Sequence, residues 1–385
     1  MRFADNRNKI GKYIPAVVFL IFIYGMALWF IFSPKPDYSS SEKRYLQKFP
    51  EVTAEKLLSG DFGSEFGTFF ADRFPQRNTW VGLNAYTALA VGNNGASGVY
   101  NCKNGYLINK PVSTENNLDK NIGAVADFAK SIDTPTTVML VPSTGYIVDD
   151  VLPTFHDKYN DDEDISKISS TLSKDKIGFV DLRERFKSEY KNGSQIYYKT
   201  DHHWTTKGAY TGYQELCKAL GITPIDDSTL KKDSYPDFYG TTYSSSGFWL
   251  TPPDNIEIWN NPKNSDRNIS VKITEGANIK TSGSMYFTDH LKEDDKYPVF
   301  IDGNHALTEI TNTNAKNGTI LLIKDSFSHS LAPFLAENYS KVVLVDLRYY
   351  KESVSDLVTT YNPEQVVVLY GIDNLATDTD IVWLK

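Results

Sequence analysis

The chain has 385 residues, of which 41% are hydrophobic and 23% charged. This composition is that of a folded protein with a substantial core, and it excludes an intrinsically disordered chain. The formal net charge of -8 argues against nonspecific nucleic-acid binding, which requires a basic surface.

The first predicted element is a membrane-spanning helix at residues 13–32. Its sequence, YIPAVVFLIFIYGMALWFIF, contains no charged residue and has the length that crosses a bilayer core. Basic residues precede it at positions 2, 7, 9 and 12 against the single acidic Asp5. This bias predicts a single-pass cell-membrane protein with a cytoplasmic N-terminus and an extracytoplasmic remainder. The competing interpretation is a cleavable signal peptide. No clear cleavage site follows the apolar stretch before Ser33, which argues against this interpretation.

The remainder begins with a polar stalk at 34–60 that enters a short helix. Apolar residues at helical spacing then predict a helix over 61–80. Residues 99–109 predict a β-hairpin around Asn104-Gly105, a pair that favours tight turns. The expected domains are a cytoplasmic tail and anchor (1–33), a stalk and helical lead-in (34–98) and a main domain (99–385).

From about residue 121, helix-like and strand-like stretches alternate. Continuous apolar runs such as TTVMLV at 136–141 are typical of buried strands. Strands that alternate with helices predict a parallel sheet with helices on both faces. The expected strands are 136–141, 178–182, 318–324, 341–346 and 365–370, and the expected helices are 121–131, 165–174, 183–190, 206–220, 328–337 and 351–359.

Residues at about 221–300 interrupt this alternation. They are rich in Ser, Thr, Asp, Tyr and Pro. This composition predicts an irregular, β-rich insertion that forms one wall of a cleft, a kind of segment that often carries function.

The chain has two cysteines, Cys102 and Cys217, far apart in sequence. They can form one disulfide if the domain faces an oxidising compartment. Two separate buried thiols are the other interpretation, and the sequence leaves both open.

Ser326 follows a predicted strand and precedes a predicted helix. In open parallel sheets, ligands bind beyond the carboxyl ends of the strands. The N-terminus of the following helix offers N–H groups for an oxyanion, an arrangement that suits acyl transfer. The plainer interpretation is that Asp325 and Ser326 cap a helix.

The second constellation is Asp201-His202-His203-Trp204, which lies between a strand-like and a helix-like stretch. A catalytic triad needs a His within reach of the nucleophile and a carboxylate that holds its tautomer. Asp and His are also common metal ligands, but no further His or Cys stands at ligand spacing, so no metal is expected. A structural turn, a triad and a metal site remain the three interpretations.

Together these elements resemble the DHHW protein family, which is related to the alginate O-acetyltransferase proteins of the SGNH-hydrolase-like group. The most specific element is Thr200-Asp201-His202-His203-Trp204-Thr205, and the others are short. They are Asp72-Arg73-Phe74-Pro75, Gly105-Tyr106-Leu107, Gly208-Ala209, Tyr239-Gly240, Asp325-Ser326-Phe327 and Asp346-Leu347-Arg348-Tyr349-Tyr350.

In the acetyltransferase relatives the pattern is Asp-x-His-Trp, with the Ser in a later strand-turn-helix. The resemblance therefore implies a triad of Asp201, His203 and Ser326. Because Asp and His precede Ser here, the reverse of the usual SGNH order, it also implies a circularly permuted SGNH-hydrolase-like sheet.

The resemblance also implies candidate oxyanion or substrate contacts. Residues 368–374 resemble the strand and Gly-x-Asn-Asp block that supplies an oxyanion Asn, with the last two residues exchanged. This makes Tyr370 and Asn374 candidates, and Gly303-Asn304 is a further one or an ordinary turn. The remaining candidate contacts are His202, Trp204 and Arg348.

The function implied by the resemblance is that of a membrane-anchored, extracytoplasmic acyltransferase or esterase that O-acetylates cell-surface polysaccharide. No cofactor is expected, because acetyl-CoA is not supplied outside the cytoplasm, and a membrane-bound O-acyltransferase partner is implied as the acetyl source. One alternative is a noncatalytic polysaccharide-binding or assembly protein with the same fold, which the exchanged Asp373-Asn374 pair favours. A metal-dependent hydrolase is another alternative.

Overall fold

The computed structural model describes residues 2–113 and 117–384, with the side chains from residue 13 onward, and divides into two compact units, 1–87 and 88–385. Helix α1 (Arg2–Phe32) contains the apolar stretch Tyr13–Phe32, with a mean hydropathy of 2.4. Among the described residues it alone is long and apolar enough to cross a membrane, so it is a candidate anchor or signal sequence. The basic side chains at positions 2, 7, 9 and 12, on which the predicted orientation depends, lie outside the described part.

The helix expected over 61–80 is wrong in one respect, because two helices occupy this region. Helix α3 (Asp61–Asp72) ends before Pro75, and α4 (Arg77–Ala90) begins after it. Proline has no N–H to donate and disfavours helical geometry in the preceding residue, so the chain turns here. The first unit also contains β1 (Tyr38–Ser39), β2 (Arg44–Tyr45) and α2 (Ala54–Ser59).

The predicted hairpin at 99–109 is confirmed. Tyr100 of β4 pairs with Ile108 of β5 in antiparallel register. Asn104 and Gly105 both have positive φ, 57° and 78°, which this tight connection requires and which Asn and Gly adopt most easily. The small sheet consists of β3 (Gly95–Ala96), β4 (Val99–Asn101) and β5 (Leu107–Asn109).

Cys102 and Cys217 are free, buried thiols, which decides between the two interpretations of the sequence. Burial raises the pKa of each thiol to about 12. They are therefore protonated at neutral pH and unreactive.

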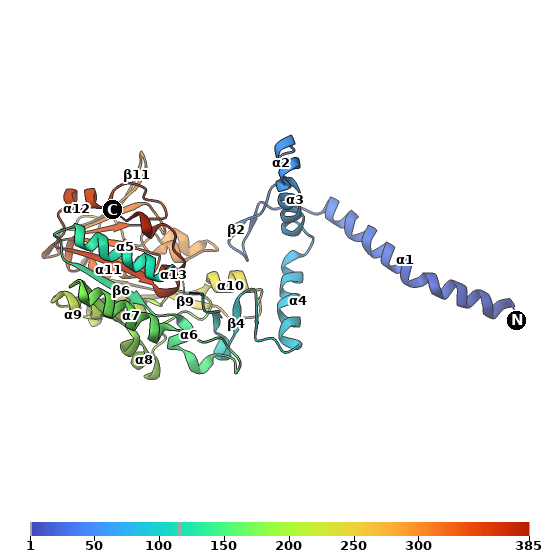
Figure 1. The fold of residues 1–385 in the computed structure, drawn as a ribbon, viewed down its shortest axis with the longest axis horizontal. Coiled ribbons are helices and arrows are strands. Elements are labelled where there is room, and N and C mark those ends of the chain that lie inside the picture. The colour runs from blue at the N-terminus through green and yellow to red at the C-terminus, as the bar shows by residue number, and fades with distance from the viewer. Residues whose placement is uncertain (1, 114–116, 385) are drawn as a thin grey trace. The chain divides into compact units, whose positions relative to one another are not determined.

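The second unit is built on a large sheet, of which Figure 1 labels β11 and β6. It has eight strands in the order β11-β10-β12-β14-β13-β15-β6-β7. The five strands β14, β13, β15, β6 and β7 are parallel, as predicted, but β12, β10 and β11 extend the sheet in antiparallel fashion, so the sheet is mixed. The strands are β6 (Thr136–Val141), β7 (Gly178–Asp181), β10 (Ile269–Glu275), β11 (Asn278–Ser282), β12 (Leu307–Asn312), β13 (Asn317–Lys324), β14 (Tyr339–Val345) and β15 (Gln365–Gly371).

Residues 221–300 are β-rich, as expected, but mostly regular. Strands β8 (Lys231–Phe238) and β9 (Asp254–Asn260) form a separate antiparallel pair that is joined by α10 (Thr241–Ser246). Strands β10 and β11 join the main sheet instead. In β10, Ile269, Val271 and Ile273 are buried while the residues between them are more exposed, which is the alternation of a strand with one covered face.

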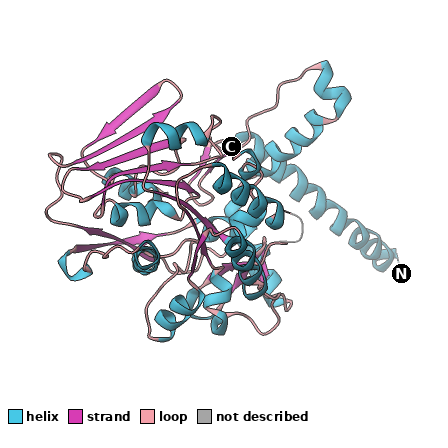
Figure 2. Cartoon of the chain, turned by 60° about the vertical axis from the view of Figure 1, so that its left-hand side comes forward, coloured by secondary structure: helices cyan, strands magenta, loops and turns pink. Residues whose placement is uncertain are grey.

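Helices cover both faces of the sheet (Figure 2). The sheet divides the core into two layers. Alternate residues of β15 divide between them: Val367 and Leu369 belong to one layer, and Val368 and Tyr370 to the other. One layer includes α8 (Arg183–Lys191), α9 (Thr206–Leu220) and α11 (Ser328–Leu335), and the other includes α5 (Leu118–Ser131), α7 (Asp161–Lys174), α12 (Val354–Tyr361) and α13 (Ile372–Thr377). Because five neighbouring strands are parallel, their carboxyl ends lie at one edge of the sheet. Side chains from segments far apart in the sequence can meet at this edge.

Candidate active site

Three side chains form a continuous hydrogen-bonded chain at this edge. His203 Nε2 lies 2.7 Å from Ser326 Oγ, and His203 Nδ1 lies 2.5 Å from Asp201 Oδ1. All three residues are buried, with Ser326 9% exposed. A carboxylate, an imidazole and a hydroxyl in this order match the geometry by which a His accepts a proton from a Ser.

The carboxylate of Asp201 is held in its charged form. Burial alone would raise its pKa, but the adjacent imidazoles and the hydrogen bonds from His203 lower the pKa well below its usual range. Oδ1 also accepts the backbone N–H of His203 at 2.8 Å, and Oδ2 accepts the backbone N–H of Thr241 at 2.7 Å. An ionised Asp201 so placed favours the tautomer of His203 that carries its proton on Nδ1.

The turn that carries Asp201 and His203 is held by a second carboxylate, Asp254 of β9. Its oxygens accept the backbone N–H of Lys199 at 3.1 Å and of Thr200 at 2.8 Å. Gly240, just before α10, allows this helix to approach Asp201, because a Cβ at position 240 would lie 2.1 Å from the Cβ of Asp201. Nothing in the sequence pattern pointed to Asp254.

Trp204 joins this turn to the turn of Ser326. Its indole N–H is 3.0 Å from the carbonyl oxygen of Phe327 and 2.9 Å from Ser330 Oγ. The side chain is fully buried, and its ring meets that of Phe327 edge-on at 5.5 Å. Trp204, a candidate substrate contact from the sequence, is thus placed as a support that aligns His203 with Ser326.

Asp325 organises the turn after β13. Its Oδ2 accepts the backbone N–H of Gly371 and the side-chain amide of Asn374, both at 2.7 Å. Its Oδ1 accepts the N–H of Phe327 at 3.0 Å, so the carboxylate ties the ends of β13 and β15 together. No side chain caps α11, which differs from the plainer interpretation of Asp325 and Ser326.

A buried ion pair lies behind the same turn. Lys324 Nζ is 2.8 Å from Asp346 Oδ2, and the two residues are 2% and 0% exposed. Arg348, another candidate contact, binds the same carboxylate through Nε at 2.9 Å and Nη2 at 2.6 Å. Nη2 also donates to Asn304 Oδ1 at 2.9 Å. These three hydrogen bonds hold the guanidinium of Arg348 in this network.

The remaining candidate contacts are placed differently from one another. Tyr370 packs in the core layer opposite the one that holds Trp204. Asn374 borders a pocket beside Asp201 and uses one amide hydrogen for Asp325, which leaves the other for a ligand. Tyr297, which the sequence did not single out, stacks on the ring of His203 with centroids 4.0 Å apart.

His202 borders the same pocket, and its ring centroid lies 3.8 Å from that of His203. Its Nδ1 lies 2.6 Å from Thr241 Oγ1. Burial and the neighbouring imidazole lower the pKa of His202 to about 4, so it is neutral at pH 7.

Asp201, His202 and His203 have potential metal-ligand atoms within 4.8 Å of one another. Both ring nitrogens of His203, however, already have partners, Asp201 and Ser326. A metal ion on His203 would have to displace one of them, so the donor set fits a proton relay better than a metal centre.

The fold and the site together define the class of this protein. It is a mixed α/β protein in which a Ser, a His and an Asp are linked by hydrogen bonds at the carboxyl edge of the sheet. A family model described as DHHW protein matches residues 109–345, more than half of the chain, so the chain belongs to the DHHW protein family. No curated protein sequence matches it.

Two solved structures share this fold, and a third is a weaker match. A DHHW family protein from Eubacterium siraeum is 18% identical with a TM-score of 0.63, over 75% of this chain and 95% of that one. Bacillus cereus PatB1, in a structure with a sulfonyl adduct, is 20% identical with a TM-score of 0.61, over 74% and 97%. The O-acetyltransferase domain of Pseudomonas putida AlgJ matches with 15% identity and a TM-score of 0.48, over 75% and 95%.

Replacement of Trp204 by Phe should destabilise the protein by about 1–3 kcal/mol, because it removes the buried indole N–H that donates to the carbonyl of Phe327 and to Ser330 Oγ. Chemical denaturation of the full-length protein measures this loss. Trp383→Phe is the matched control, since Trp383 is 67% exposed. Equal unfolding midpoints for the two variants would contradict the role given to Trp204.

The neutral state of His202 predicts a pH dependence of stability. The folded protein keeps His202 unprotonated down to about pH 4, whereas the unfolded chain binds a proton near pH 6.5. Its contribution is therefore complete above pH 6.5 and is lost as the pH falls toward 4. The unfolding midpoint should drop less between pH 7 and 4.5 in His202→Asn than in the wild type, and parallel curves would refute this expectation.

Proposed function

We propose that this protein is a membrane-anchored, extracytoplasmic serine acyltransferase or esterase that O-acetylates a cell-surface polysaccharide. The observation that carries the proposal is the 2.7 Å contact between His203 Nε2 and Ser326 Oγ, continued to Asp201. The apolar helix at 13–32 supports the anchor, and the resemblance of the Asp-His-His-Trp element to acetyltransferases supports the acetyl group and the polymer.

In the first step, His203 Nε2 removes the proton of Ser326 as Oγ bonds to the carbonyl carbon of an acetyl ester. The carbonyl π electrons move to the oxygen and form a tetrahedral oxyanion. When the carbonyl re-forms, the donor C–O bond breaks, and the departing alcohol takes the proton from His203. Asp201 stabilises the imidazolium throughout, and the product is an acetyl ester on Ser326.

In the second step, a sugar hydroxyl gives its proton to His203 and attacks the acetyl carbon. The Ser326 ester bond then breaks, and Oγ recovers the proton. Water in place of the sugar would make the protein an esterase. No acetyl-CoA is needed, and a membrane-bound O-acyltransferase partner would supply acetyl groups across the bilayer.

We propose two donors for the oxyanion. The backbone N–H of Ser326 makes no hydrogen bond to any other described residue, and Asn374 keeps one amide hydrogen unused by Asp325. Asp325 orients both groups, since it holds Asn374 and the turn that contains Ser326.

The alternative, a noncatalytic polysaccharide-binding or assembly protein, is less well supported. The exchanged Asp373-Asn374 pair favoured it in the sequence. In the structure, however, Asn374 still reaches the turn of Ser326 through Asp325, and the Ser–His–Asp chain is complete.

Modification by a sulfonyl fluoride tests the nucleophile. Ser326 of the full-length protein should be sulfonylated with loss of fluoride, which intact-mass and peptide mass spectrometry detect. The PatB1 structure described with a sulfonyl adduct supports this choice of reagent. Ser326→Ala should abolish the modification, whereas Ser328→Ala should retain it.

Acetyl transfer gives the decisive measurement. Release of nitrophenol from 4-nitrophenyl acetate, with and without an oligosaccharide acceptor, separates transferase, esterase and inert outcomes. Ser326→Ala and His203→Ala should each lower the rate by roughly 10³-fold or more. A Ser326→Ala variant that keeps its full activity would contradict the proposal.

A further inference from the structure

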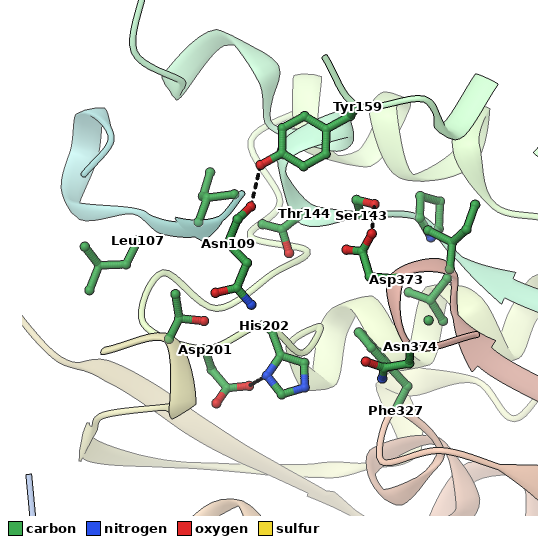
Figure 3. A pocket seen from close by; sticks show the side chains of 17 residues that line it. Leu107, Asn109, Ser143, Thr144, Tyr159, Asp201, His202, Phe327, Asp373 and Asn374 are labelled. Atoms are coloured by element: carbon green, nitrogen blue, oxygen red, sulfur yellow. Dashed lines mark hydrogen bonds and ion pairs between the residues drawn. The ribbon is translucent and has the colours of Figure 1, made fainter. Parts of the chain in front are cut away.

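A pocket of about 60 Å³ lies beside the Ser–His–Asp chain (Figure 3). Its walls come from β5, from the segments that follow β6 and β15, and from the Asp-His-His turn. Asp201, His202 and Phe327 border it. Because Phe327 follows Ser326 and the ring of His202 contacts that of His203, a group in this pocket lies next to the proposed nucleophile.

The pocket presents hydrogen-bonding groups that other described residues leave unused. Ser143 Oγ donates to Asp373 Oδ1 at 3.1 Å, but the second oxygen of Asp373 accepts no hydrogen bond from the described chain. The side chains of Asn109 and Thr144 likewise make none there. Figure 3 shows these groups around one hollow. They suit a ligand with several hydroxyl groups.

The wall that carries these groups is rigid. Asp161 accepts the backbone N–H of Ser143 at 2.7 Å. Tyr197 donates to the carbonyl of Pro142 at 2.6 Å, and Tyr159 donates to the carbonyl of Asn109 at 2.5 Å. A pocket ordered before binding loses little entropy when its ligand enters.

The charge of the pocket is one-sided. Its seventeen lining residues include the carboxyl groups of Asp201 and Asp373 but no Lys or Arg, and Asp161 lies just behind Ser143. His202 supplies no positive charge at neutral pH, because its pKa is about 4. Burial raises the pKa of Asp373 to about 6, so at pH 7 it is mostly ionised. Arg348 acts electrostatically on His202 from outside the lining, but its guanidinium is bound to the carboxylate of Asp346. An anionic group would therefore meet repulsion from Asp201 and Asp373, with no cation in the pocket wall to offset it.

We propose that this pocket receives the hydroxyl- or amine-bearing edge of an acceptor sugar, with Asp373 as the residue that selects neutral or cationic sugars and rejects uronates. The proposal deepens and rests on the acyl-transfer function proposed above. The pocket is small, at about 60 Å³. It therefore holds one edge of a ring, with the rest of the polymer outside. The other occupant, the acetyl methyl group, would leave the second oxygen of Asp373 without a hydrogen-bond donor.

The test compares three β-1,4-linked tetrasaccharides as acceptors for the full-length protein in detergent: a cello-oligosaccharide, a glucosamine oligomer and a uronate oligomer. The donor is 4-nitrophenyl acetate, and mass spectrometry quantifies the acetylated tetrasaccharides. The wild type should transfer to the neutral and cationic acceptors at least ten-fold better than to the uronate. A uronate that serves equally well or better would overturn the proposal.

Asp373→Asn removes the charge at nearly constant shape. Within this variant, the rate ratio of uronate to neutral acceptor should rise at least five-fold over the wild-type ratio, and a ratio within the variant cancels any general loss of activity. Asp289→Asn is the matched control and should leave the ratio unchanged, because the Asp289 side chain is 93% exposed. An unchanged ratio in Asp373→Asn would overturn the role of Asp373 and assign the pocket to the acetyl group.

A second variant serves if Asp373→Asn does not fold. Thr144→Val removes a hydroxyl from the same wall and should raise the KM of the neutral acceptor at least five-fold, with a smaller change in kcat. An unchanged acceptor KM would place the sugar elsewhere.

Failure of this inference is distinguishable from failure of the proposed function. Release of nitrophenol that depends on Ser326 in the absence of acceptor reports acyl-enzyme chemistry alone. If that release is absent, calorimetric binding of the three tetrasaccharides to Ser326→Ala tests the pocket separately. The order cationic or neutral above uronate supports the pocket, and any other order overturns it.

Discussion

The candidate site depends on the hydrogen bond between the indole of Trp204 and the carbonyl of Phe327. These residues are 123 positions apart, and they belong to the two turns that carry His203 and Ser326. Both residues are buried, so no water can replace the bond when it breaks, and its loss costs free energy. This cost helps to hold the two turns in the relative position in which His203 Nε2 and Ser326 Oγ lie 2.7 Å apart.

Buried carboxylates perform the same task within each turn. Asp254 accepts backbone N–H groups of the His203 turn, and Asp325 accepts those of the Ser326 turn and of Gly371. Asp201 is both a support of the backbone and a member of the Ser–His–Asp chain, since it binds the backbone N–H of Thr241 and the ring of His203. Fixed acceptors of this kind place catalytic groups before any substrate arrives, which is the basis of electrostatic preorganisation.

The accuracy of the sequence-based predictions followed the strength of the local signal. The strand at 136–141 and the helix at 206–220 have the predicted bounds, because one is uniformly apolar and buried and the other has a clear helical period that ends before Gly221. The helix expected over 61–80 is broken at Pro75. Strand β12 was not predicted, since LTEITN gains its place by pairing with β10 and β14, which are distant in sequence.

The sequence by itself determined where the five parallel strands and the helices between them lie along the chain, and the presence of an Asp, a His and a Ser near turns. These properties depend on neighbours in the chain, where hydrophobic period and turn chemistry act. Only the tertiary structure decided the partners of those side chains: Trp204 turns inward to Phe327, Arg348 binds Asp346, and Asn374 binds Asp325. Each buried polar group must find a partner among the groups that the fold brings near, and that choice is made by segments far apart in sequence.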